Sequence, residues 1–199
     1  VRVNASKKVG NVEASLTSSY FTDYTNVVGG TIGDQDRPLY WFLLNTSANI
    51  PLSKYKDWDN PLSYGHANNY YNAYYQNPYW AVGTNRNIDY SNRLIGNLNL
   101  SWDIYEWLNF TGRVGANNIW GDGKNWRAAQ EYDSDRQPSA QAVTSFVEET
   151  EYLRNTYTGD ALLTGSFNFL ENFSLKAILG GTIYSTNFKS SYMRGNNLS

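Results

Sequence analysis

The chain has 199 residues, 41% of them hydrophobic and 17% charged, and a formal net charge of −2. This balance gives no electrostatic basis for binding nucleic acid. The sequence has no cysteine, which excludes a disulfide scaffold, a cysteine–zinc site and a cysteine nucleophile.

Apolar and polar residues alternate with period two along several segments, which predicts β-strands. In the clearest segment Leu98, Leu100 and Trp102 alternate with Asn99 and Ser101. No run of 18 apolar residues occurs, so no transmembrane helix is predicted. In chain order the expected strands span residues 1–9, 12–25, 89–105, 107–119, 151–169 and 173–187.

The predicted connections alternate between tight turns and long loops. Tight turns are expected at Gly10-Asn11, at Tyr105 to Trp107 and at Leu170 to Asn172, and long surface loops over 26–88 and 120–150. Short turns at one end of the strands and long loops at the other are typical of transmembrane β-barrels. Strand length agrees, because a strand of about 14 residues tilted by about 45° is long enough to cross an apolar band of ~25 Å. Strands of soluble proteins usually have only about five or six residues.

Aromatic residues lie at both ends of the expected strands, as in the two interfacial girdles of membrane barrels. The fold class is therefore predicted as all-β, an antiparallel transmembrane β-barrel segment. Six strands cannot close such a barrel, because the smallest have about eight, and open edges are not tolerated at membrane depth. The segment is thus expected to belong to a larger barrel.

The long loop over 26–88 is the main candidate for a functional site because it is rich in tyrosine and tryptophan. Rings with polar tips stack on sugars or anchor a protein partner, although they could equally form the loop's own small core. Two further tryptophans lie at the second loop. The candidate substrate- or lid-contacting residues are Trp41, Trp58, Tyr70, Tyr71, Tyr74, Tyr75, Tyr79, Trp80, Trp120 and Trp126.

A succession of motifs in the middle of the chain resembles a known family. The motifs are Asn49–Trp58, Tyr70–Trp80 with its Asn-Pro-Tyr-Trp ending, Arg93–Leu100 and Trp107–Gly115. Together they resemble the mid-barrel region of SusC/RagA-type TonB-dependent transporters. The resemblance covers roughly 49–117, whereas 1–25 and 150–187 match only as generic barrel hairpins.

This resemblance implies a Gram-negative outer-membrane barrel of about 22 strands with an N-terminal plug. It also implies a SusD-like surface lipoprotein that hands over an oligosaccharide or peptide, and TonB acting through the plug. The plug, the TonB-contacting segment and the closing strand are not found in this sequence. The expected partners are therefore the lipoprotein, the remainder of the barrel with its plug, TonB and outer-membrane lipid.

No catalytic or metal motif is found, so neither an enzyme nor a cofactor is expected. His66 is the only histidine, which leaves no support for a Ser-His-Asp triad. Asp34-Gln35-Asp36 and Asp122–Asn125 could offer oxygen ligands to calcium, but neither matches an EF-hand and both are ordinary turn compositions. Glu148, Glu149 and Glu151 are expected to form a solvated charge run.

Two other classes of protein remain as alternatives. One is a soluble carbohydrate-binding β-sandwich, motivated by the aromatic loops, although sandwiches prefer short strands with turns every ~8–12 residues. The other is a secreted glycosidase domain, motivated only by the carboxylate-rich loops.

Overall fold

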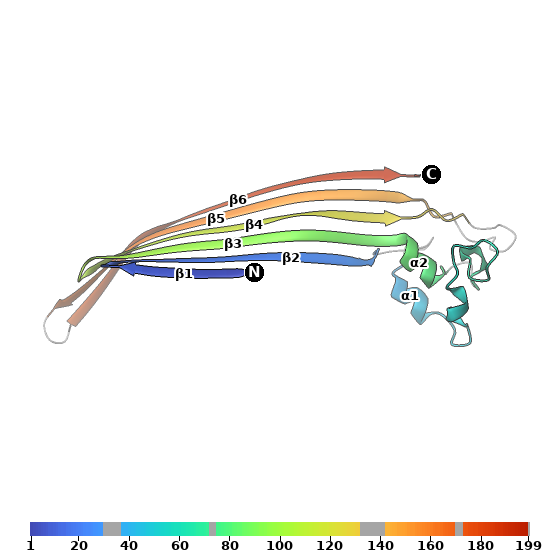
Figure 1. The fold of residues 1–199 in the computed structure, drawn as a ribbon, viewed down its shortest axis with the longest axis horizontal. Coiled ribbons are helices and arrows are strands. Elements are labelled where there is room, and N and C mark those ends of the chain that lie inside the picture. The colour runs from blue at the N-terminus through green and yellow to red at the C-terminus, as the bar shows by residue number, and fades with distance from the viewer. Residues whose placement is uncertain (30–36, 72–74, 132–141, 170–172, 199) are drawn as a thin grey trace. The chain divides into compact units, whose positions relative to one another are not determined.

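The computed structural model describes residues 1–29, 37–71, 75–131, 142–169 and 173–198. Six strands form one antiparallel sheet in the order β1-β2-β3-β4-β5-β6, so each strand pairs with its neighbours in sequence (Figure 1). This confirms the predicted all-β, antiparallel class. The sheet is not closed into a barrel, because β1 and β6 are its two edges.

β2 to β6 are longer than their alternation predicted, at the ends away from the tight turns, whereas β1 is one residue shorter. There the apolar period fades, and side-chain bonds such as Lys124 Nζ to Glu149 Oε1 at 2.9 Å also join neighbouring strands. The predicted loops are correspondingly shorter. The strands are β1 Arg2–Val9, β2 Val12–Val28, β3 Asn85–Tyr105, β4 Leu108–Arg127, β5 Phe146–Phe169 and β6 Phe173–Asn196.

The first predicted turn is observed at Gly10-Asn11, where Val9 pairs with Val12. Gly10 has a φ of 60°, which a two-residue hairpin with glycine at its first position requires. A second turn joins β3 to β4 through Glu106 and Trp107. The turn predicted at 170–172 lies outside the described residues.

The chain divides into two compact units. Unit 1 comprises Val1–Asp23, Ser91–Gly121 and Tyr152–Ser190, and unit 2 comprises Tyr24–Tyr90, Asp122–Glu151 and Ser191–Ser199. In its described residues, unit 1 contains strands and the tight turns that join them. Unit 2 holds the remaining strand ends and the short helices α1 Leu39–Leu44, η1 Leu52–Tyr55, η2 Ala67–Asn69 and α2 Pro78–Thr84.

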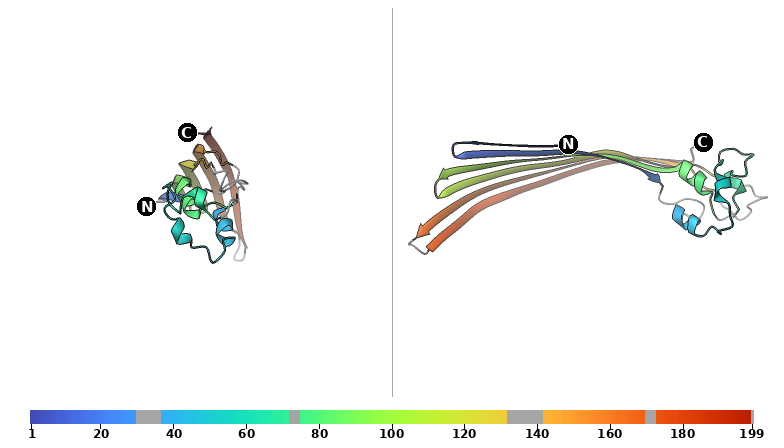
Figure 2. Two further views of the ribbon diagram at one scale, coloured as in Figure 1. Left: turned by 90° about the vertical axis from the view of Figure 1, so that its right-hand side faces the viewer. Right: turned by 60° about the horizontal axis from the view of Figure 1, so that its bottom comes forward.

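Part of the predicted loop over 26–88 therefore folds into short helices, and its two ends extend β2 and β3 (Figure 2). The helices escaped sequence analysis because each has only three to seven residues, too few to establish a helical period. None of the helices that the structure describes is both long enough and apolar enough to span a membrane.

Strand pairing in unit 1 produces two chemically different faces. Residues on one face alternate with residues on the other, as in any pleated sheet. One face, here called the polar face, carries the cross-strand contacts of Ser15 with Asn99, of Ser101 with Asn109 and of Asp160 with Thr182. The opposite face, here called the apolar face, carries residues such as Leu98, Leu100, Val114, Ala161 and Ile183.

Charged side chains are distributed very unequally between these faces. Within the strands of unit 1, alternation assigns only Lys7 and Lys189 to the apolar face, each on an edge strand. The central strands β2 to β5 have no charged residue on that face within unit 1. Alternation assigns the following charged residues to the polar face: Arg2, Lys8, Glu13, Asp23, Arg93, Asp103, Arg113, Arg154, Asp160 and Lys176.

Hydrophobic burial is also unequal between the two units. Every buried hydrophobic residue that the structure describes lies in unit 2. In unit 1 even the large apolar side chains are accessible; Ile183, for example, is 76% exposed. The described part of unit 1 is thus a sheet with an apolar face but no core of its own.

Candidate functional site

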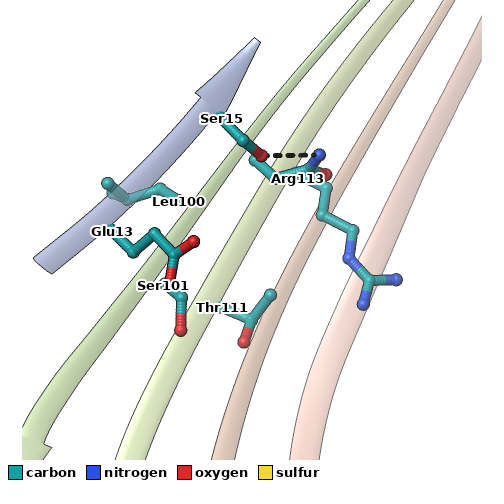
Figure 3. Close-up of a pocket in the computed structure, with 7 residues that line it drawn as sticks. Glu13, Ser15, Leu100, Ser101, Thr111 and Arg113 are labelled. Carbon is teal, nitrogen blue, oxygen red and sulfur yellow. Dashed lines mark hydrogen bonds between the residues drawn. The ribbon is translucent and has the colours of Figure 1, made fainter. Parts of the chain in front are cut away.

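The polar face of unit 1 contains an open hollow between β2, β3 and β4. Asn99 of β3 donates a hydrogen bond of 3.4 Å from Nδ2 to Ser15 Oγ on the adjacent strand β2. Figure 3 shows Glu13 beside Ser101, with Ser15 and Thr111 nearby, and the Arg113 side chain extending away from Glu13. The hollow therefore combines hydroxyl, amide, carboxylate and guanidinium groups, which can bind water or a hydroxyl-rich solute.

Hydrogen bonds along the same face pre-order its amide groups. Asn109 donates from Nδ2 to Ser101 Oγ at 3.1 Å and to Asp103 Oδ1 at 2.7 Å. Nearer the other end of β3, Arg93 donates from Nε to Asn117 Oδ1 at 2.9 Å. These polar side chains bond to neighbouring strands through their own donors and acceptors. They keep this face hydrated and leave the backbone hydrogen bonds between the strands intact.

In unit 2, Glu148 is the centre of a cross-strand cluster rather than a free carboxylate. Its Oε1 accepts from Arg194 Nη1 at 2.8 Å and from Tyr192 Oη at 2.9 Å, and its Oε2 accepts from Asn125 Nδ2 at 3.0 Å. The Arg194 guanidinium also lies 4.7 Å from the ring centre of Phe146. Because three donors occupy Glu148, its geometry is that of a strand-tying group rather than of a general acid.

This cluster differs from the solvated charge run expected at 148–151. Both Glu148 and Glu149 lie in β5, and Glu149 pairs with Lys124 of β4 at 2.9 Å. The Lys124–Glu149 pair is half-exposed and contributes little stability. The sequence missed the cluster because its members come from three separate strands, β4, β5 and β6.

Most of the predicted loop aromatics pack into unit 2. Its core consists of Phe42, Ala67, Trp80 and Ala81, and the partly buried Trp41, Trp58 and Tyr75 pack against it. Local sequence permits this packing: a Cβ added at Gly83 would lie 2.5 Å from Cζ2 of Trp58, so the ring needs a glycine there. The structure therefore gives these rings a packing role within unit 2.

A second group of rings forms a chain of tyrosines. Tyr70 is only 4% exposed and its ring centre lies 4.8 Å from Tyr55 and 4.9 Å from Tyr71, both in edge-to-face geometry. The chain continues from Tyr71 to Tyr75. Its hydroxyls have partners, since Tyr55 donates to Tyr64 and Tyr71 donates to the Asn45 carbonyl.

The remaining candidate residues lie apart from these clusters. Trp120 belongs to unit 1, on the apolar face, where its ring centre is 6.3 Å from that of Tyr20. Trp126 of β4 and Tyr79 of α2 are half-buried in unit 2. Tyr74 lies outside the described residues. The structure thus separates Trp120 from the other candidates that it describes.

Asn77, which begins the Asn-Pro-Tyr-Trp motif, is the polar centre of unit 2. It is fully buried and caps α2 by accepting from the Tyr79 N–H at 3.0 Å. Its Nδ2 donates to the carbonyls of Tyr55 at 2.8 Å and Gly65 at 2.6 Å. Asparagine followed by proline at the first helical position is a sequence signal for a helix start, and it could have located α2.

Two buried tyrosines make the stability of unit 2 dependent on pH. Burial raises the pKa of Tyr55, and the hydrogen bond to Tyr64 raises it further. Burial also raises the pKa of Tyr70, although its contact with Thr46 acts in the opposite direction. Each phenol thus keeps its proton in the folded state at a pH at which the unfolded chain has lost it.

We therefore expect the free energy of unfolding to fall as pH rises above about 10, the pKa of an unfolded tyrosine, because the unfolded state then binds fewer protons. The loss is at most about 1.4 kcal/mol per pH unit for each tyrosine. Urea unfolding monitored by tryptophan fluorescence between about pH 8 and pH 11 measures it. In Tyr55→Phe the free energy of unfolding should fall less steeply with pH than in the wild type. If the double variant Tyr55→Phe with Tyr70→Phe keeps the wild-type pH dependence, these two tyrosines are not its cause.

Metal ligands do not assemble in the described part of the chain. No group of three or more histidine, aspartate or glutamate side chains is placed to hold an ion there. Asp122 lies in β4 and is exposed. The candidate ligands Asp34 and Asp36 lie outside the described residues.

No protein-family model matches this chain, and no curated protein matches it significantly. The resemblance over residues 49–117 consequently depends on the sequence motifs alone.

Proposed function

We propose that this chain is part of the wall of a SusC-like TonB-dependent transporter in the outer membrane of a Gram-negative bacterium. Such a transporter works with a SusD-like surface lipoprotein to import oligosaccharides or peptides. The observation that carries the proposal is the charge asymmetry of unit 1. Its central strands have no charged residue on the apolar face, whereas Glu13, Arg93, Asp103, Arg113 and Asp160 occupy the polar face. Lipid-facing and lumen-facing residues alternate in this way in membrane barrels.

The absence of a core in the described part of unit 1 supports the same proposal. Leucines 98, 100, 175 and 179 are all exposed, and Leu179 reaches 76%. A soluble sheet has to cover such a face with a helix or a second sheet. Lipid chains cover it equally well, which explains why a sheet this apolar on one side needs no protein layer there.

Strand dimensions agree with membrane crossing. The uncharged stretch of β3 on the apolar face runs from Asn92 to Ile104. Its 13 residues rise about 3.3 Å each, so a tilt of about 45° gives roughly 28 Å of height, close to the ~25 Å apolar band. Trp102 lies at one end of this stretch, and Trp120 of β4 pairs with Tyr20 at the other.

The proposal assigns each partner a surface. Further strands of the barrel pair with the open edges of β1 and β6, since unpaired edges are not tolerated in lipid. The plug, through which TonB acts, meets the charged polar face. The SusD-like lipoprotein meets unit 2, where α1 leaves Tyr40, Leu43 and Leu44 exposed. In this assignment the buried rings of Tyr70 and Trp80 support the surface rather than touch cargo.

Two neighbouring substitutions test the membrane assignment. Thr182 and Ile183 are consecutive in β6, on the polar and apolar faces respectively, and both are exposed. In the complete protein expressed in cells, Ile183→Arg is expected to cost about 2–4 kcal/mol of barrel stability, because it places a charge in lipid. We expect the folded, heat-modifiable form in outer-membrane fractions to fall strongly.

Thr182→Arg is the matched control. It adds the same side chain beside Asp160, a carboxylate that Thr182 already contacts at 2.8 Å, and is expected to leave insertion unchanged. In a soluble protein both exposed positions would accept arginine with little cost, within about 0.5 kcal/mol. Equal behaviour of the two variants, or recovery of the complete protein in the soluble fraction, would refute the proposal.

A further inference from the structure

The apolar face of unit 1 has a depression whose floor is made by small residues. On three adjacent strands the floor consists of Gly112 of β4, Gly159 and Ala161 of β5, and Gly181 of β6. Larger side chains bound it, with Leu98 and Leu100 on the β3 side and Ile183 on the β6 side. This row of small residues lies between large apolar side chains on the two outer strands of the depression.

The lining of this depression offers no charged side chain to a ligand. Arg113, Asp160 and Thr182 also line it, but alternation puts all three side chains on the polar face, where Asp160 accepts from Thr182 at 2.8 Å. What remains is leucine, isoleucine, valine, alanine and glycine backbone. Such a surface suits a flexible hydrocarbon chain, because neither a sugar nor a peptide would find partners for its polar groups there.

The position of the depression along the strands points to the acyl region of a bilayer. Towards the tight turn, Trp102 follows Leu100 on the same face of β3. Towards the other end, Trp120 of β4 lies on the same face as Gly112, and its ring centre is 6.3 Å from that of Tyr20. Rings with polar tips settle at the membrane interface, so the floor between these two rows lies at hydrocarbon depth rather than at the headgroups.

Two of the three floor glycines, Gly159 and Gly181, leave open space, whereas a Cβ at Gly112 would lie 3.3 Å from Cε1 of Phe110. A Cβ built at Gly159 or at Gly181 meets no heavy atom within 4 Å. The depression is therefore not closed by neighbouring side chains, and a larger residue can occupy it without disturbing the backbone. A void of this kind on a lipid-facing surface loses dispersion contacts unless a chain enters it.

Building on the proposed function, we infer that this depression is a binding groove for one acyl chain of an outer-membrane lipid. The chain would lie between the Leu98–Leu100 ridge and Ile183, over Gly112, Gly159 and Gly181. Its occupant is a membrane lipid, because the groove is continuous with the uncharged face that the proposal places in the bilayer. The groove would hold this lipid longer than the lipids that surround the rest of the wall.

Filling the groove tests the inference. The complete protein is reconstituted in vesicles containing phosphatidylethanolamine with a photoactivatable group on its acyl chain, and crosslinked peptides are identified by mass spectrometry. We expect wild-type crosslinks to concentrate on peptides containing residues 98–100 and 112–114. In Gly159→Leu combined with Gly181→Leu, this crosslinking is expected to fall about fivefold, equivalent to about 1 kcal/mol.

Gly96→Leu provides the matched control. Gly96 lies on the apolar face of β3, its Cβ would also meet open space, and it does not line the groove. Crosslinking in this variant should equal that of the wild type. Unchanged crosslinking in the double variant, or crosslinks from these peptides to a second copy of the chain instead of lipid, would overturn the inference.

The outcomes also separate this inference from the proposed function. Suppose that the protein inserts, that Ile183→Arg prevents insertion, and that Gly159→Leu with Gly181→Leu leaves the crosslinking unchanged. Then the lipid-binding groove is refuted, and the membrane assignment stands. If the protein does not enter the vesicles, both the groove and the membrane assignment fail. Heat-modifiable migration of each glycine variant, measured in parallel, establishes that the added leucines leave the barrel folded.

Discussion

Asn77→Asp is expected to unfold much of unit 2 at neutral pH. Asn77 is fully buried and donates to two backbone carbonyls, those of Tyr55 and Gly65, at 2.8 and 2.6 Å. An ionised carboxylate has no proton to donate, so the exchange leaves two buried acceptors facing a buried negative charge. Each lost bond with an unsatisfied partner costs about 1–3 kcal/mol, and the uncompensated charge adds to this. We expect a loss of about 4 kcal/mol or more.

The pH dependence of this variant identifies the cause. Below about pH 4 the aspartate regains a proton and can donate one of the two bonds, so part of the lost stability should return. Asn77→Ala, which removes the bonds and the α2 cap without adding charge, should show no such recovery. Asn49→Asp makes the same exchange at an exposed residue of unit 2 and should be nearly neutral. A stable Asn77→Asp at pH 7 would show that Asn77 does not organise unit 2.

Phe42→Ala is expected to cost about 3–5 kcal/mol, the range for truncating a buried phenylalanine. Phe42 is fully buried in α1, at the centre of the core with Trp80 and Ala81. Its ring makes edge-to-face contacts with Trp41 at 5.5 Å and Tyr75 at 6.0 Å, which the substitution also removes. Hydrogen exchange should show the loss as faster exchange across residues 37–71 and 75–84.

Tyr40→Ala is the internal control for this prediction. Tyr40 lies two residues away in the same helix and is 64% exposed, so its removal should change exchange rates little. If the SusD-like lipoprotein meets the exposed side of α1, Tyr40→Ala should instead weaken that complex while leaving unit 2 folded. Equal exchange in Tyr40→Ala and Phe42→Ala would contradict the core that the structure assigns to unit 2.

Alternation alone was sufficient to predict the sheet. The pattern of Leu98, Leu100 and Trp102 against Asn99 and Ser101 specified both the strand and its two faces, because side-chain direction in a strand reverses at every residue. The strand ends were less predictable. Beyond Gly121 the sequence loses its alternation, yet β4 continues to Arg127, and there Lys124 and Asn125 donate to Glu149 and Glu148 of β5.

The aromatic loop shows the limit of sequence reasoning most clearly. Composition predicted that its rings would matter, but it could not distinguish rings that pack together from rings that face a partner. Trp80 and Tyr70 are buried, while Tyr40 of the same unit is exposed. That difference depends on contacts between segments far apart in sequence, such as Asn77 with Gly65, and no local pattern records them.

The sequence by itself therefore determined the all-β class, the six strands, the two turns that the structure describes and the placement of charge on one face. These properties are local, since each follows from the period-two geometry of a single strand or from the residues of one turn. Only the tertiary structure decided the core of unit 2, the cross-strand cluster around Glu148 and the glycine-floored groove between Leu100 and Ile183. These features require strand register and long-range packing, which bring together residues from separate strands and loops.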